Sequence, residues 1–174
     1  MPKANLVLIG FMGTGKTRIG KICARELGFA FRDSDTLIER KIGRRVSDIF
    51  RERGETAFRA IEREMIAELA QGTEQVISTG GGVALSDANV EVLRETGTVL
   101  WLSASPEVLL SRVGGKNAYK RPLLASAPDP LQKIREMLIE REPYYRDAAD
   151  FNVLSENRRP GDIAEQIIRR FLES

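Results

Sequence analysis

The sequence contains no histidine and only one cysteine, Cys23, in 174 residues. Without histidine, neither a Ser-His-Asp nor a Cys-His catalytic arrangement can form, and a Cys/His zinc site needs more than one thiol. Any general base that acts at neutral pH must therefore be a carboxylate, a lysine or water. A single cysteine also excludes an internal disulfide.

Long apolar runs and an excess of one charge are missing as well. No uninterrupted apolar run approaches the roughly 18 residues that a membrane span needs. The first residues carry only Lys3 before a short apolar run that ends at Gly10, which is unlike a signal peptide. The 27 Lys and Arg nearly balance the 25 Asp and Glu, so no global field favours nucleic acid or an anionic membrane. We expect a soluble, cytoplasmic protein that binds neither.

The length is typical of one domain with a sizeable core, and we interpret residues 1–174 as a single domain. Apolar runs that favour strands alternate with segments of helical periodicity. The strands are expected at residues 5–9, 29–31, 75–78, 98–102 and 151–154. The helices are expected at about residues 19–27, 37–42, 46–70 with a break near Gly54, 88–94, 107–113, 131–141 and 162–171. This alternation predicts an α/β fold with a parallel sheet covered by helices on both faces.

One stretch, residues 114–130, departs from this regular pattern. It contains two adjacent glycines, then Lys116, Lys120 and Arg121, and then three prolines. A long irregular segment inside a compact domain is usually a lid or a disordered loop.

Residues 10–17, GFMGTGKT, match the phosphate-binding pattern G-x-x-x-x-G-K-[ST] between a predicted strand and a predicted helix. Gly13, Thr14 and Gly15 would turn their backbone N–H groups toward phosphate oxygens at a helix N-terminus. Lys16 would reach the β- and γ-phosphates, and the Thr17 hydroxyl would bind Mg²⁺. The alternative is a glycine-rich turn that carries a lysine by chance.

Two missing motifs and two carboxylates indicate which class of phosphate-binding protein this is. The GTPase patterns D-x-x-G and N-K-x-D do not occur. Asp33 and Asp35 follow the second predicted strand, at the end of the sheet where open α/β folds place their ligands. One of them could position hydrated Mg²⁺ while the other accepts a proton from a substrate hydroxyl. Either could also cap the following helix, and these roles are compatible.

The chain resembles the shikimate kinases over nearly its whole length. The resemblance rests on motifs in the expected order: residues 10–17, Asp33-Ser-Asp35, Phe58-Arg59 with Glu62, Gly80-Gly81-Gly82, Arg121-Pro-Leu-Leu, and Arg141 before Pro143-Tyr144. It implies a P-loop NTPase fold similar to nucleoside monophosphate kinases, with a five-stranded parallel sheet flanked by helices. It also implies a substrate-binding helical region at about 33–61 and a mobile lid at about 112–125. The family transfers the γ-phosphoryl of ATP to the 3-hydroxyl of shikimate, a step toward chorismate and the aromatic amino acids.

The resemblance also implies a role for each matching residue. Asp35 would bind the shikimate hydroxyls and act as the base, and Asp33 would hold Mg²⁺ through water. Arg59 and Arg141 would bind the shikimate carboxylate. The glycines that would line the shikimate ring are Gly80, Gly81 and Gly82.

The nucleotide side would receive two further arginines. Arg121 would reach from the lid toward the phosphates. Asn157-Arg158-Arg159-Pro160 resembles the family's adenine-binding loop. We assign the adenine contact to Arg158, although the sequence does not decide between Arg158 and Arg159. ATP and shikimate are thus the expected partners, with Mg²⁺ as cofactor; a monomer is expected, although the sequence does not determine the oligomeric state.

Elementary chemistry leaves alternatives for the acceptor residues. Arg59 has Glu55 four residues before it and Glu62 three after it, which is the spacing of ordinary helix ion pairs. Arg141 falls on an apolar stripe if the helix continues through Pro143, so its charge needs a partner, either a ligand carboxylate or a buried acid. The three glycines could serve positive φ, close approach of a ligand, or an ordinary turn.

The chain departs from many relatives in two places. Many relatives carry extra charged residues between the first lid arginine and the Arg-Pro-Leu-Leu element, whereas here residues 112–121 read RVGGKNAYKR. Arg18 follows the phosphate loop where a small residue is common. Both differences concern the lid and loop contacts more than the reaction. The rival functions are another small-molecule kinase, acting on gluconate or a nucleotide, and a regulatory module that binds ATP without phosphoryl transfer.

Overall fold

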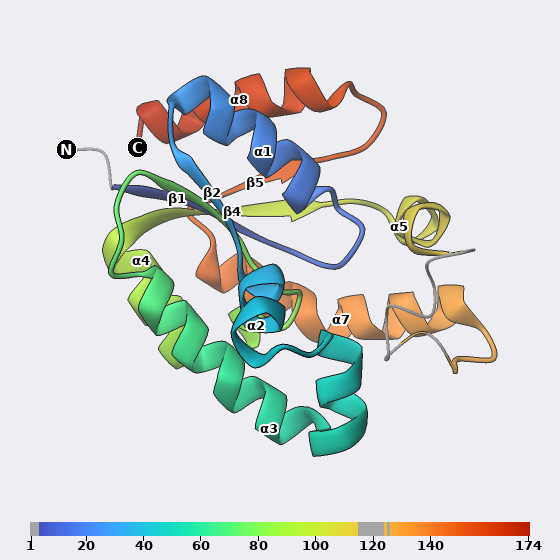
Figure 1. The fold of residues 1–174 in the computed structure, drawn as a ribbon. Helices are drawn as coiled ribbons and strands as arrows, with labels where there is room; N and C mark the ends of the chain where they lie inside the picture. The colour runs from blue at the N-terminus through green and yellow to red at the C-terminus, as the bar shows by residue number, and fades with distance from the viewer. Residues whose placement is uncertain (1–3, 115–123, 125) are drawn as a thin grey trace.

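The computed structural model describes residues 4–114, 124 and 126–174. Five parallel strands form one sheet in the order β2-β3-β1-β4-β5 (Figure 1). The strands are β1 Asn5–Ile9, β2 Ala30–Asp33, β3 Gln75–Ser78, β4 Gly97–Ser103 and β5 Phe151–Leu154. All five predicted strands are confirmed. The second strand extends to Asp33 because its pairing with β3 continues to Ser78.

Helices cover both faces of this sheet, as Figure 1 shows. The helices are α1 Lys16–Leu27, α2 Ser34–Ile42, α3 Val46–Leu69, the short 3-10 helix η1 Val83–Leu85, α4 Asp87–Thr96, α5 Pro106–Val113, α7 Pro130–Ala148 and α8 Pro160–Leu172. Helices α1 and α8 lie on one face, and α3, α4 and α7 lie on the other (Figure 1). The predicted α/β fold is therefore confirmed. Most of the lid predicted at 112–125 lies outside the described residues.

The core consists of two apolar clusters, one on each face of the sheet. In β1, Leu6 and Leu8 belong to the cluster under α1 and α8, whereas Val7 and Ile9 belong to the opposite cluster. Successive side chains of a strand point to opposite faces, so a strand covered on both sides must be apolar throughout. This explains why the run at residues 5–9 shows no polar alternation.

Two helices contain a residue that disfavours helical structure, with different outcomes. The break predicted in α3 is present at Gly54, whose φ of 82° and ψ of 172° are not helical. Helix α7, in contrast, continues through Pro143 to Ala148. The helical spacing therefore continues past the proline. Ile134, Leu138 and Tyr145 all lie buried on one face of α7.

The topology brings the predicted functional segments to one edge of the sheet. In parallel strands the carboxyl ends meet at the same edge, where open α/β folds bind their ligands. The phosphate loop follows β1, Asp33 ends β2, and Gly80 follows β3 after Thr79. In the described part of the chain, no helix is long and apolar enough to cross a membrane.

Candidate active site

The phosphate loop needs glycine at defined positions. Gly10, Gly13 and Gly15 have φ values of 142°, 83° and 95°, which L-residues with side chains rarely adopt. A Cβ atom at Gly13 would lie only 2.6 Å from the Val113 side chain. The loop therefore depends on glycine for its backbone shape and for its close packing against α5.

Lys16 lies at the beginning of α1 and is only 8% exposed. Its Nζ donates hydrogen bonds to the carbonyl oxygens of Gly10 and Phe11, at 2.7 and 2.9 Å. In the described part of the chain, no side chain caps the N-terminus of α1. The first backbone N–H groups of α1 and the lysine ammonium are thus gathered where an anion would bind.

Asp33 connects the phosphate loop to α2. Its Oδ2 accepts a hydrogen bond of 3.1 Å from the Thr17 hydroxyl, and its Oδ1 accepts one of 3.0 Å from the Thr36 N–H. The helix cap expected as an alternative is therefore real, and it belongs to Asp33. The cap uses one carboxylate oxygen, and the other oxygen reaches Thr17.

Asp35 is a half-buried carboxyl group in the first turn of α2. Its Oδ1 is enclosed and has no hydrogen-bond partner among the described residues. Burial raises its pKa from 3.8 to about 7, helped by the negative charges of Glu62 and Asp33 and opposed by Lys16. A carboxyl with this pKa can both accept and release a proton near neutral pH.

Glu62, which the sequence analysis treated only as an ion-pair partner of Arg59, is a central residue of the site. It is only 1% exposed, and its Oε1 binds Arg59 Nη1 at 2.8 Å. Its Oε2 is buried without a partner in the described ranges. Burial raises the pKa of Glu62, whereas the positive charges of Arg59 and Arg141 lower it. An acid three residues after Arg59 was visible in the sequence, but its burial was not.

Arg59 combines the ordinary and the functional interpretation. It pairs with Glu62 and, at 3.3 Å, with Glu55, so the helix ion pairs are present. Its guanidinium also lies 5.3 Å from the centre of the Phe58 ring. A Cβ atom added at Gly82 would lie 2.5 Å from this guanidinium, so Arg59 reaches the glycine loop as well.

The glycine loop, residues 80–82, is needed for close approach and not for an unusual backbone conformation. None of its three glycines has a positive φ, so of the alternatives left open by the sequence this one does not apply. A Cβ atom at Gly80 would lie 2.9 Å from Asp35 Oδ1 and 3.0 Å from Glu62 Oε2. The two carboxyl groups therefore approach the same point of the backbone from two different helices.

Arg141 is a buried cation, 6% exposed, on the apolar stripe of α7. Among the described residues no carboxylate forms a direct ion pair with it, although the buried Glu62 carboxylate is close enough for the charge of Arg141 to lower its pKa. Its guanidinium lies 5.7 Å from the centre of the Phe11 ring. A Cβ atom at Gly81 would lie 3.5 Å from Arg141 Nη1. The site thus contains a desolvated guanidinium facing the glycine loop.

Of the two arginines expected on the nucleotide side, the structure describes Arg158. Arg158 is exposed and donates to Gln166 Oε1 and the Asp162 carbonyl of α8, at 2.5 and 3.3 Å. Arg112, which sequence reasoning placed in the lid without a role, donates to the Gly13 carbonyl at 3.2 Å and the Ser155 carbonyl at 2.6 Å. It therefore ties the phosphate loop to the segment after β5. Arg121 lies outside the described residues.

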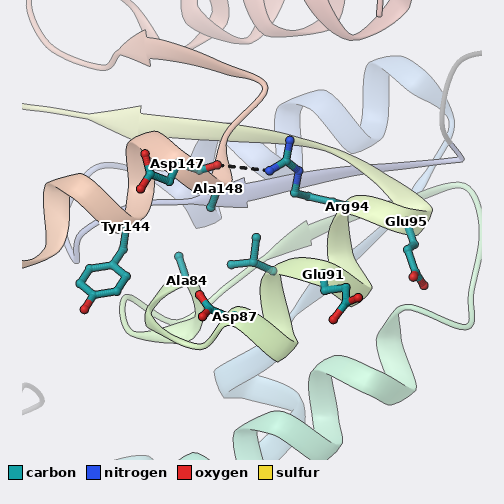
Figure 2. Close-up of a pocket in the computed structure, with 9 residues that line it drawn as sticks. Ala84, Asp87, Glu91, Arg94, Glu95, Tyr144, Asp147 and Ala148 are labelled. Atoms are coloured by element: carbon teal, nitrogen blue, oxygen red, sulfur yellow. Dashed lines mark hydrogen bonds between the residues drawn. The ribbon is translucent and has the colours of Figure 1, made fainter.

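A groove of about 670 Å³ lies apart from these residues, between α4 and the end of α7 (Figure 2). Figure 2 shows acidic side chains around it, among them Asp87 and Glu91, and Arg94 donating to the Asp147 carbonyl at 3.3 Å. None of the residues predicted to bind substrate lines this groove. The predicted site residues gather instead between the phosphate loop, α2, α3, the glycine loop and α7.

Comparison with known proteins decides which kinase family has this site. The family model described as shikimate kinase matches residues 12–172. The chain belongs to the shikimate kinase family. As a shikimate kinase, it phosphorylates shikimate with ATP in the shikimate pathway. The regulatory module without phosphoryl transfer and the gluconate or nucleotide kinase are therefore set aside.

Individual relatives agree over the full length. The shikimate kinase of Symbiobacterium thermophilum is 44% identical over 169 residues, covering 97% of both chains. That of Thermodesulfovibrio yellowstonii is 45% identical, covering 96% of this chain and 94% of its own. Among solved structures, shikimate kinase from Acinetobacter baumannii in complex with shikimate superimposes with a TM-score of 0.93 at 36% identity, covering 98% of this chain and 94% of that one. A gluconokinase from Sinorhizobium meliloti, at 16% identity and a TM-score of 0.62, shares the fold alone.

Proposed function

We propose that this site transfers the γ-phosphoryl of ATP to the 3-hydroxyl of shikimate, with the described residues in the roles below. The observation that carries the proposal is the convergence of Asp35, with its raised pKa, and the buried guanidinium of Arg141 on one glycine loop beside the phosphate loop. The direct test measures ADP release with shikimate, gluconate and mononucleotides as acceptors. Turnover confined to shikimate, with the phosphate located on the 3-hydroxyl by NMR, is expected. Phosphorylation at another hydroxyl would refute the assignment.

On the nucleotide side, Lys16 and the N–H groups of residues 13–17 would hold the phosphates. The lysine is already buried at the loop, so its charge acts in a region with little water and compensates the charge that spreads over the transferring phosphoryl oxygens. We assign Arg121 to the same phosphates and Arg158 to adenine, as the family resemblance implies. Arg112 would keep the phosphate loop in register with the segment after β5.

Thr17 and Asp33 fit the requirements of Mg²⁺. Their hydroxyl and carboxylate oxygens lie 3.1 Å apart next to the phosphate loop, and hard oxygen ligands are those that Mg²⁺ prefers. No cluster of three or more acidic, cysteine or histidine side chains that could hold a metal alone occurs in the described ranges, which is consistent with an ion that shares its ligands with ATP. When bound, Mg²⁺ would neutralise negative charge on the phosphate oxygens.

Asp35 would serve as the base for the acceptor. As the hydroxyl oxygen of shikimate forms its bond to the γ-phosphorus, the bond to the leaving oxygen of ADP breaks, and the hydroxyl proton passes to the Asp35 carboxylate. Phosphoryl transfer through a loose transition state depends more on the alignment of the reacting groups than on a strong base. A pKa of about 7 keeps a sufficient fraction of Asp35 ionised at neutral pH while leaving it able to take the proton.

The acceptor carboxylate would bind Arg141 and Arg59. The two guanidinium groups approach the glycine loop at neighbouring residues, Gly81 and Gly82. The monomeric state stays a prediction of the sequence. The cytoplasmic location stays a prediction of the sequence.

Replacing Arg141 with lysine is expected to raise the Kd for shikimate at least about tenfold, because an ammonium cannot reproduce the parallel donors of a guanidinium. The measurement is a shikimate titration and a thermal melt on the same preparation. Arg146→Lys, an exposed site on the same helix, serves as the matched control. A lower melting temperature with an unchanged Kd would make Arg141 a structural residue.

Replacing Asp33 with asparagine is expected to raise the Mg²⁺ concentration needed for half-maximal activity about tenfold or more. Asparagine caps a helix as well as aspartate does, so α2 should persist while the negative charge toward the ion is lost. Activity is measured across a range of Mg²⁺ concentrations, with Thr17→Ser, which keeps the hydroxyl, as the control. An unaltered Mg²⁺ requirement in Asp33→Asn would remove Asp33 from the metal site.

A further inference from the structure

Tyr145 lies one helical turn after Arg141 on the buried face of α7. It is 0% exposed, and its ring lies 5.9 Å from that of Trp101 in β4. Its hydroxyl donates a hydrogen bond of 2.6 Å to the carbonyl oxygen of Gly81. This bond joins the glycine loop to a helix that lies 64 residues further along the chain.

The bond sets the orientation of a peptide group in the acceptor site. Because a trans peptide is planar, a Gly81 carbonyl that points to Tyr145 directs the N–H of Gly82 the opposite way. Within the described residues, that N–H donates no hydrogen bond. Tyr145 therefore determines where a free donor of the glycine loop points.

Tyr145 also lies beside the buried guanidinium of Arg141. Burial raises the pKa of the Tyr145 hydroxyl, and the nearby positive charge of Arg141 lowers it, so the two groups interact. Arg141 also lies beside the Phe11 ring of the phosphate loop. Arg141 is thus held by a phenol and an aromatic face, and no carboxylate of the described residues forms a direct ion pair with it, since the nearby Glu62 binds Arg59.

We propose that Tyr145 is a positioning residue that holds the Gly81 peptide and Arg141 in their binding geometry before shikimate arrives. The inference rests on the proposed role of Arg141 as a ligand of the acceptor carboxylate. Tyr145 does not touch the reacting atoms; it acts through Gly81 and Arg141. A site ordered in advance binds more tightly because fewer groups lose freedom on binding.

The test replaces Tyr145 with phenylalanine, which removes one oxygen and keeps the ring that fills the α7 face. Shikimate is titrated into the nucleotide-free protein, and binding is followed by the fluorescence of Trp101, the chain's single tryptophan. We expect the Kd for shikimate to rise about tenfold, as loss of one buried hydrogen bond can cause. The KM for ATP and kcat at saturating shikimate should remain within about twofold, because the lost bond touches neither the phosphate loop nor the base.

Tyr144→Phe is the matched control. Tyr144 is the preceding residue, its side chain is 45% exposed, and it lines the groove of Figure 2, away from the glycine loop. This variant should bind shikimate like the unmodified protein. An equal loss of affinity in both variants would overturn the proposal.

Two further measurements separate the ways in which the inference could fail. If Tyr145→Phe melts at a lower temperature but keeps the original Kd, Tyr145 is a packing residue and the proposal is wrong. If Arg141→Lys also leaves the Kd unchanged, the fault lies in the proposed acceptor site. A normal Kd in Tyr145→Phe together with a weakened Arg141→Lys refutes only the positioning role.

Discussion

Shikimate turnover is expected to fall at least about a hundredfold when Lys16 is replaced with alanine. The buried ammonium lies at the phosphate loop, and loss of one preorganised charge in a dry site typically costs this much. The effect should appear in kcat, because the charge matters most while negative charge spreads over the phosphoryl oxygens. The measurement is a coupled assay of ADP release at saturating ATP and shikimate.

The control separates catalysis from folding. Nζ of Lys16 also bonds two loop carbonyls, so the variant must be shown to be folded by circular dichroism and a thermal melt. Lys21→Ala removes an exposed lysine from the same helix and should leave turnover nearly unchanged. Near-normal turnover in folded Lys16→Ala would refute the role of the lysine.

Asp35→Asn is expected to lower kcat by about 10² or more and at the same time to stabilise the protein. An amide cannot accept the hydroxyl proton, and general base catalysis contributes rate factors of roughly this size. The amide also removes a poorly solvated charge and offers an N–H near the unpartnered Oε2 of Glu62. Function and stability should therefore move in opposite directions at this position.

The pH dependence of the gain follows from the direction of the pKa shift. Asp35 has a pKa of about 7 in the folded protein against an ordinary value of 3.8, so the folded state binds its proton more tightly than the unfolded state does. The cost of ionising it is absent below about pH 4, grows as the pH rises, and is complete above about pH 7. At ~1.36 kcal/mol for each pH unit, removing the charge should add about 4 kcal/mol to the free energy of unfolding at pH 8 and roughly 2 kcal/mol at pH 5.

Chemical denaturation of both proteins at pH 5 and pH 8, without nucleotide or metal, measures this difference. Asp147→Asn, a change at an exposed site, should show neither the gain in stability nor the loss of turnover. In the unmodified enzyme, kcat/KM should fall as the pH drops below about 7, because protonated Asp35 cannot act as a base. An Asp35→Asn variant no more stable than the parent at pH 8 would contradict the buried-charge argument.

The helices, the strands and the phosphate loop could be predicted from local sequence patterns. The apolar runs, the helical periodicity and the glycine spacing of residues 10–17 are properties of short windows, and each of them predicts a local backbone shape. Gly54 is an example, since its break in α3 was visible from one residue type. The helix ends predicted from the sequence were least accurate where packing overrides propensity, as in α7, which continues beyond Pro143.

The acceptor site required knowledge of which distant segments meet. The burial of Glu62, its approach to Asp35 at Gly80, and the bond from Tyr145 to Gly81 join segments far apart in the chain. The same holds for Arg112, whose partners on the phosphate loop and after β5 could not be read from its spacing. From the sequence alone, the glycines at 80–82 matched an ordinary flexible turn as well as a loop that a ligand approaches closely. Only the positions of their neighbours distinguish the two.

By itself, the sequence determined the alternation of strands and helices, the phosphate loop, the absence of histidine chemistry, and through its motifs the resemblance to shikimate kinases. Only the tertiary structure decided that Asp35 has a raised pKa, that Arg141 is a buried cation with no direct ion pair among the described residues, and that Glu62 is buried. The reason is physical: a pKa or the availability of a charge depends on desolvation and on distances to groups from other segments, and neither quantity is encoded in the spacing of neighbouring residues.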